Sequence, residues 1–116
     1  MKKIFIALLI ILFDAESNAQ SGCLPQLSED SFEIKLKKIK NYDFDQVKKD
    51  SIELLLIQCP TCDQMKQLLK ELSFEEDKLD IIKKAYSKVS DPSNFKTIKT
   101  VLDFEESKNI VDQLMK

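Results

Sequence analysis

The chain has 116 residues, 43% of them hydrophobic and 33% charged, a balance typical of a soluble globular domain rather than a disordered chain. It contains no His, no Trp and a single Gly, and all 18 of its basic residues are Lys. These absences exclude imidazole bases, imidazole metal ligands and glycine-rich phosphate-binding loops. With 20 acidic residues the formal net charge is −2, so the chain lacks the basic footprint of a nucleic-acid-binding protein, and we expect no nucleic acid partner.

The beginning of the chain has the features of an export signal. A pair of lysines follows the initial Met, residues 4–13 are an unbroken apolar run, and Ser17 and Ala19 are the small residues that signal peptidase requires. Ten apolar residues are too few to span about 30 Å of hydrocarbon, so we expect no permanent membrane anchor after cleavage. The sequence predicts a signal peptide over residues 1–19, cleavage before Gln20, and an extracytoplasmic location, periplasmic or secreted.

A repeat of 30 residues organises the rest of the chain. Its three copies each contain an apolar residue, a short polar residue, Phe, an acid and, four positions after the Phe, a Lys. The short polar residues are suited to helix N-caps, and the acids to the positive end of the helix dipole. The predicted N-caps of this set are Asp43, Ser73 and Asp103. We expect the Phe side chains of the first helical position to pack inward beside each connection: Phe44, Phe74 and Phe104.

A partner helix precedes each of these three helix starts. Ser28, Thr61 and Asp91 are the predicted N-caps of the partner helices, with Gln64 completing a capping box and Pro92 at a first helical position. Apolar residues recur with the helical period, and no window alternates as a strand does. The sequence predicts an all-α fold of three stacked hairpins, a small bundle or a short superhelix. The expected helices, about six, lie near residues 30–41, 44–58, 62–71, 74–88, 92–101 and 104–115.

The predicted domain organisation follows from these helices. The signal peptide is followed by a short linker over residues 20–27 and by a helical-hairpin repeat domain over residues 28–116. Besides the three repeated Phe residues, the apolar positions of the inward helix faces form the predicted core: Phe32, Leu36, Ile39, Leu55, Met65, Leu68, Leu72, Ile82, Tyr86, Phe95, Ile98, Leu102, Val111 and Leu114.

Four stretches carry a resemblance to a known family. They are Leu-Ser-Phe-Glu-Glu-Asp-Lys-Leu-Asp at 72–80, Lys-Ala-Tyr at 84–86, Asp-Pro-Ser-Asn-Phe at 91–95 and Phe-Glu-Glu-Ser-Lys at 104–108. Over residues 27–115 the chain resembles a bacterial domain of unknown function, number 4476. The resemblance implies an exported, all-helical domain. It brings no established activity, so it assigns no functional residue.

The one chemical candidate in the sequence is Cys59-Pro60-Thr61-Cys62. A Cys-x-x-Cys beside a helix start is typical of thiol–disulfide exchangers, because the helix dipole lowers the thiol pKa and the second thiol resolves a mixed disulfide. In thioredoxin-type enzymes a strand precedes the Cys-x-x-Cys, but no strand is predicted before this pair. Cys59 and Cys62 are therefore a candidate disulfide or redox pair. A structural bridge, two buried thiols and, with Met65, a Cu(I) site remain open.

Cys23 is the odd thiol of the chain, and it can pair between chains or with Cys59 or Cys62. We predict no catalytic residue, no metal and no cofactor. The sequence favours an exported, non-enzymatic helical domain that binds an unidentified protein or envelope component. The alternative is a thiol–disulfide redox protein or sensor that uses Cys59 and Cys62.

Overall fold

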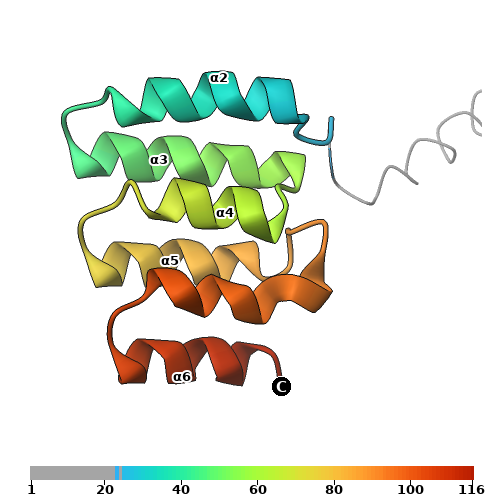
Figure 1. The fold of residues 1–116 in the computed structure, drawn as a ribbon, viewed down its shortest axis with the longest axis vertical. Helices are drawn as coiled ribbons and strands as arrows, with labels where there is room; N and C mark the ends of the chain where they lie inside the picture. Colours follow the sequence, from blue (N-terminus) through green and yellow to red (C-terminus); the bar gives the residue numbers. More distant parts are fainter. Residues whose placement is uncertain (1–22, 24) are drawn as a thin grey trace, which may run out of the picture.

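The computed structural model describes Cys23 and residues 25–116 (Figure 1). Within this part the chain forms five α-helices and two 3₁₀ segments and no strand, which confirms the all-α prediction. No helix of the described part is both long and apolar enough to cross a membrane. The predicted signal peptide and its cleavage site before Gln20 lie outside the described residues.

The helices follow one another through short connections. In chain order they are α2 (Glu29–Lys40), α3 (Asp45–Leu55) with its 3₁₀ extension η2 (Leu56–Gln58), α4 (Cys62–Leu69), α5 (Glu75–Ala85), the 3₁₀ helix η3 (Pro92–Val101) and α6 (Glu105–Leu114). Each predicted helical range overlaps one of these segments. The range 92–101 is helical as expected, but its type is 3₁₀.

The 3₁₀ geometry of η3 has two causes in the sequence. Its buried residues Phe95, Ile98 and Val101 are spaced by three, which matches the three residues per turn of a 3₁₀ helix. In addition, the Thr97 hydroxyl donates to the carbonyl of Asn94 three residues back, at 2.7 Å. Such local side-chain bonds compete with the backbone pattern of an α-helix.

The hairpins stack in two layers (Figure 1). In one layer α2 packs on α4 and α4 on η3; in the other, α3 packs on α5 and α5 on α6. The three hairpin turns, residues 41–44, 70–74 and 102–104, lie on the same edge of the stack, on the left in Figure 1. We call these turns the corners. The two remaining connections lie on the opposite edge.

The core lies between the layers. Most of the predicted core residues are buried: Phe32, Leu36, Ile39, Leu55, Met65, Leu68, Leu72, Ile82, Phe95, Ile98, Leu102 and Val111. Tyr86 and Leu114 are partly buried and pack against this cluster. These positions confirm the helical periodicity of the sequence.

The three repeated Phe residues are not in the core, and that prediction is wrong. Phe44, Phe74 and Phe104 are 71%, 62% and 61% exposed. Each is the N-cap residue, in extended conformation, so its side chain lies outside the first helical turn. The residue two positions earlier packs inward instead, and Leu72 and Leu102 are only 3% exposed.

The predicted N-caps divide into two groups. Ser28 accepts a bond from the Ser31 N–H at 3.2 Å, and Thr61 forms a complete capping box with Gln64, so both predictions are confirmed. Asp43, Ser73 and Asp103 are not N-caps, because each helix begins one residue later than predicted. The following Phe occupies the N-cap position, and its side chain makes no cap bond. Asp91 stands at the N-cap position of η3, but its side chain makes no cap bond there.

Candidate functional site

The second and third corners are each held by the acid that follows Phe in the preceding repeat. One oxygen of the Asp45 carboxylate accepts the Ser73 N–H at 2.9 Å. One repeat later the Glu75 carboxylate accepts the N–H groups of Asp103 and Phe104, at 3.1 Å each for the shorter contacts. Burial works against the charge of Glu75, but these backbone bonds hold its pKa below the usual value. The acid thus binds the backbone just before the next helix and fixes the turn that leads into it.

The repeated Lys completes the same arrangement. Lys48 donates to the carbonyl of Glu71 at 3.5 Å, and Lys78 donates to the equivalent carbonyl of Val101 at 3.0 Å. These carbonyls lie at the end of the preceding segment, where cations are favourable. In the first two repeats the acid and the Lys are therefore explained by packing between hairpins. The Phe that precedes them is not.

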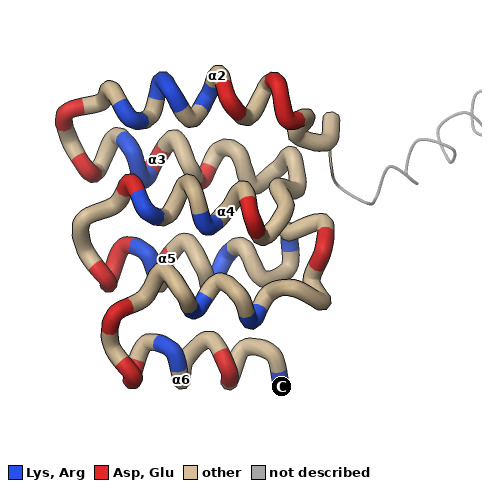
Figure 2. The backbone as a smooth tube through the Cα atoms, viewed as in Figure 1, with Lys and Arg blue, Asp and Glu red and all other residues tan. Residues whose placement is uncertain are grey.

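The exposed Phe side chains make a row along the corners. We call Phe44, Phe74 and Phe104, with the acids that flank them, the corner edge. Figure 2 shows Asp and Glu at each of the three corners. The flanking acids that are exposed are Asp43, Glu76, Asp103, Glu105 and Glu106. Around the middle Phe, a shallow open depression is lined by Phe74, Glu75, Glu76 and Asp77. The corner edge is thus an aromatic and acidic surface.

The cysteines do not pair as the Cys-x-x-Cys pattern suggested. Cys59 forms a disulfide with Cys23, with the Cα atoms 5.2 Å apart, whereas Cys62 is a buried free thiol. The predicted Cys59–Cys62 pair is therefore wrong, and one of the alternative pairings of Cys23 is found. Disulfides persist in oxidising compartments, so the bridge is consistent with an extracytoplasmic environment.

The local backbone explains why Cys59 and Cys62 do not pair with each other. Cys59 ends η2 in the left-handed conformation, with φ 49° and ψ 65°, a conformation that a non-Gly residue rarely adopts. The adjacent Gln58 carbonyl accepts the Leu27 N–H at 2.9 Å, so the N-terminal segment lies against this turn. Cys62, the first residue of α4, is 1% exposed and belongs to the core cluster.

The environment of Cys62 opposes thiol chemistry. Burial, together with the bond and charge of Asp91, raises the pKa of the Cys62 thiol to about 12, whereas a nucleophilic thiol needs a lowered pKa. Its Sγ donates to the Asp91 carbonyl at 3.3 Å. Met65, the third potential Cu(I) ligand, is a core residue with 0% exposure. Among the described residues, no group of three or more His, Cys, Asp or Glu side chains is placed to hold a metal ion.

The model of one protein family, described as a domain of unknown function, DUF4476, matches residues 26–115. The chain belongs to this family. No curated protein and no solved structure matches the chain. The matched range of the DUF4476 domain includes all the helices from α2 to α6 and the whole corner edge. The description of the family carries no activity, so function has to be argued from the surfaces.

Sequence reasoning assigned Asp91 of the DUF4476 domain to the wrong helix. The Asp91 carboxylate accepts the backbone N–H of Cys62 at 2.7 Å, so it caps α4 rather than its own helix. Its other oxygen accepts from the Asn94 side chain at 3.0 Å. Burial opposes the charge, but these bonds hold the pKa of Asp91 below its ordinary value of 3.8. One signal in the sequence could have indicated this contact. Asp91 and Cys62 are 29 residues apart, close to the repeat length, as are Asp45 and Ser73, which also bond between repeats.

We expect Asp91→Ala to lower the free energy of unfolding by about 1–3 kcal/mol at neutral pH, because the Cys62 N–H loses its acceptor. The contribution of Asp91 is present above the ordinary pKa of 3.8 and is lost as the pH falls through the lower folded value. Urea unfolding should therefore show the gap between wild type and variant narrowing below that pH. The matched control is Asp63→Ala, which removes an exposed acid from the first turn of α4. A gap that does not narrow at low pH would contradict the assignment.

Proposed function

We propose that the domain is an exported, non-enzymatic binding module and that a protein partner docks on the corner edge. The observation that carries this proposal is the exposure of the same Phe in all three repeats, between 61% and 71%. Isolated apolar residues on a surface are ordinary, but aromatic side chains gathered on one edge mark interaction sites. Hairpin packing accounts for the neighbouring acid and Lys, and it leaves the Phe without a structural task.

The charge of the corner edge indicates the chemistry of the partner. Exposed carboxylates flank each Phe, among them Asp43, Glu76 and Glu106. Lys and Arg side chains pair with such carboxylates and lie favourably over aromatic faces. The partner we propose is therefore a basic protein segment rather than a nucleic acid, whose phosphates these carboxylates repel.

The spacing of the corners suggests that this segment is extended. Helices that pack on one another lie about 8–10 Å apart, and successive corners belong to neighbouring helices of one layer. An extended polyproline II chain has three residues per turn and rises about 3.1 Å per residue, so basic anchors three residues apart lie on one side of it and would meet successive Phe residues. Hydrophobic and cationic contacts repeated over three corners add their free energies within one partner.

Two observations support the absence of catalysis. The chain has no His, and its buried Cys62 thiol has a raised pKa. The redox alternative requires Cys59 and Cys62 to exchange electrons as a pair, whereas Cys59 bonds to Cys23. We also propose that the signal peptide is removed before Gln20 and that the domain works in the periplasm or outside the cell, without a permanent membrane anchor.

A binding experiment with a defined probe tests the proposal. The probe is a fluorescent peptide with Lys at every third position and aliphatic residues between, and its anisotropy is followed as the protein is added. We expect Phe44, Phe74 and Phe104 changed together to Ser to weaken binding at least about tenfold, since aromatic anchors dominate such interfaces. The matched control is Ile34→Ser, which removes a side chain of similar exposure, 66%, from α2.

The control and the charge of the probe separate the possible outcomes. Equal weakening by Ile34→Ser, or an unchanged affinity of the triple Phe variant, would show that the corner edge is not the docking surface. A peptide with Glu in place of Lys should not bind. If it binds as tightly as the Lys peptide, the proposed basic partner is wrong.

A further inference from the structure

Within the layer of α3, α5 and α6, each helix packs on the previous one through the same positions of the repeat. On α5 these positions include Asp77 and Asp80, which pair with Lys49 of α3 at 3.4 and 2.8 Å, and Lys84, which pairs with Glu53 at 2.8 Å. The equivalent residues of α6 are 30 positions later, and all four are buried or half-buried: Ser107, Ile110, Val111 and Leu114. Each repeat thus has a defined face that is turned toward the previous helix of the layer.

Among the described residues, no helix of this layer lies on the same face of α3, and α2 of the other layer borders it. The positions 30 residues before those of α5 are Val47, Asp50, Ser51 and Leu54. Val47 is 41% exposed, Leu54 is 71% exposed, and Ile57 on η2 extends this apolar stripe with 59% exposure. We call Val47, Leu54 and Ile57 the end face.

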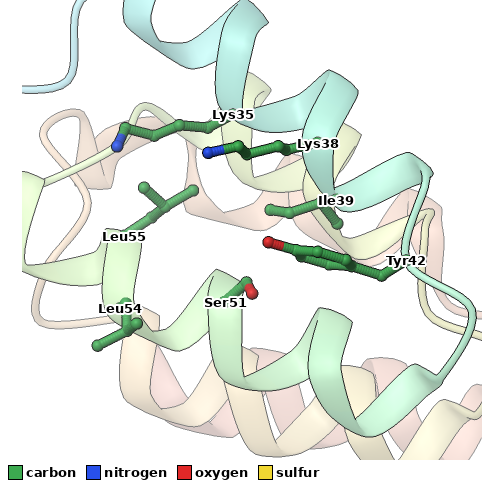
Figure 3. A pocket seen from close by; sticks show the side chains of 7 residues that line it. All are labelled: Lys35, Lys38, Ile39, Tyr42, Ser51, Leu54 and Leu55. Atoms are coloured by element: carbon green, nitrogen blue, oxygen red, sulfur yellow. The ribbon is translucent and has the colours of Figure 1, made fainter.

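A groove runs beside the end face between α2 and α3. Lys35 and Lys38 of α2 and Tyr42 of the turn after it line the groove together with Ser51, Leu54 and Leu55 of α3 (Figure 3). The groove has a volume of about 180 Å³, enough for one or two side chains. It therefore offers a recess next to an exposed apolar stripe.

The opposite end of the stack is closed by polar residues. The outward positions of α6 that correspond to Leu79 and Lys83 of α5 are Asn109 and Gln113, and both are exposed. Terminal repeats of stacked helical proteins carry polar outer faces of this kind, which keep the stack soluble. At the other end of this layer α3 instead exposes the apolar stripe, so the two ends of the layer are not complementary to each other.

We propose that the end face docks against the end face of a second copy of this chain, in a closed two-fold dimer. The polar α6 cannot cover the apolar stripe of α3, so head-to-tail stacking is disfavoured. The surface that does suit the stripe is the same stripe on a second copy, as in an isologous dimer. The charges around it agree with self-association, because Lys35 and Lys38 line the groove while Asp50 is exposed on the stripe. Two copies bring opposite charges together around an apolar centre. This surface is separate from the corner edge.

Sedimentation equilibrium of the exported chain tests this dimer. We expect the wild type to form a dimer as its concentration rises toward about 1 mM, and Leu54→Asp to raise the dissociation constant at least about tenfold. Gln113→Asp introduces the same charge at the opposite end of the stack and should leave the dimer unchanged. Leu54→Met, which keeps an apolar side chain of similar volume, should preserve it.

Folding and stoichiometry are checked in the same samples. Because Leu54 is 71% exposed, Leu54→Asp should retain the helical circular dichroism and the Tm of the wild type. If it unfolds, Val47→Ser with Ile57→Ser removes the stripe more gently and should also dissociate the dimer. A wild type that stays monomeric at about 1 mM, species larger than a dimer, or equal dissociation by Gln113→Asp would overturn the proposal.

Discussion

Replacing Cys23 and Cys59 together by Ser is expected to lower the free energy of unfolding by about 3–4 kcal/mol. The two residues are 36 positions apart, and closing a loop of that length removes much of the conformational entropy of the unfolded chain. A domain of this size has a total stability of only about 5–14 kcal/mol, so the loss is a large share of it. The Tm should fall by more than about 12 °C.

The control for this variant is Cys62→Ala, which removes the third thiol and leaves the bridge intact. Urea unfolding of this control should remain sensitive to a reducing agent, whereas the double Ser variant should not respond to it. A bridge between Cys59 and Cys62 would close a much shorter loop, and Cys23→Ser would then leave stability nearly unchanged. That result would contradict the pairing of Cys23 with Cys59.

Local patterns in the sequence were sufficient for the helices and most of the core. Apolar residues at the helical period identify a buried face, and every predicted helix has a counterpart. Capping is equally local where the oxygen that caps belongs to the same turn, as at Ser28 and Thr61. These features depend on residues three or four positions apart, which a single sequence displays directly.

At the second and third corners the errors involve contacts between repeats. Asp43, Ser73 and Asp103 have the chemistry of N-caps, but Asp45 and Glu75 reach across from the preceding repeat and bind the N–H groups of the last two. The helices begin one residue later than predicted, and the Phe of each repeat turns to solvent. Nothing within one corner reveals this, because the stabilising acid lies 28 residues away.

The pairing of the cysteines was also beyond local reasoning. Cys59 and Cys62 are close in sequence, but the left-handed turn at Cys59 and the start of α4 at Cys62 give the two side chains different surroundings. The partner of Cys59 is selected by the N-terminal segment, which is held beside η2 by the Leu27–Gln58 backbone bond.

A pair of Phe substitutions separates folding from binding most directly. Phe95→Ala is expected to lower the free energy of unfolding by about 3–5 kcal/mol, because Phe95 is 0% exposed and its ring centroid lies 4.9 Å from that of Tyr86. Phe74→Ala removes the same atoms from a side chain that is 62% exposed, so its cost should stay below about 1 kcal/mol. Urea unfolding of the two variants measures both values.

The difference between these two values decides how the repeated Phe is understood. If Phe74→Ala costs as much as Phe95→Ala, the Phe of each corner serves the fold, and the proposed docking on the corner edge loses its main support. If the cost is small, folding does not account for an aromatic side chain at the same exposed position in every repeat. Water makes such exposure unfavourable, and a partner that covers all three rings removes that cost.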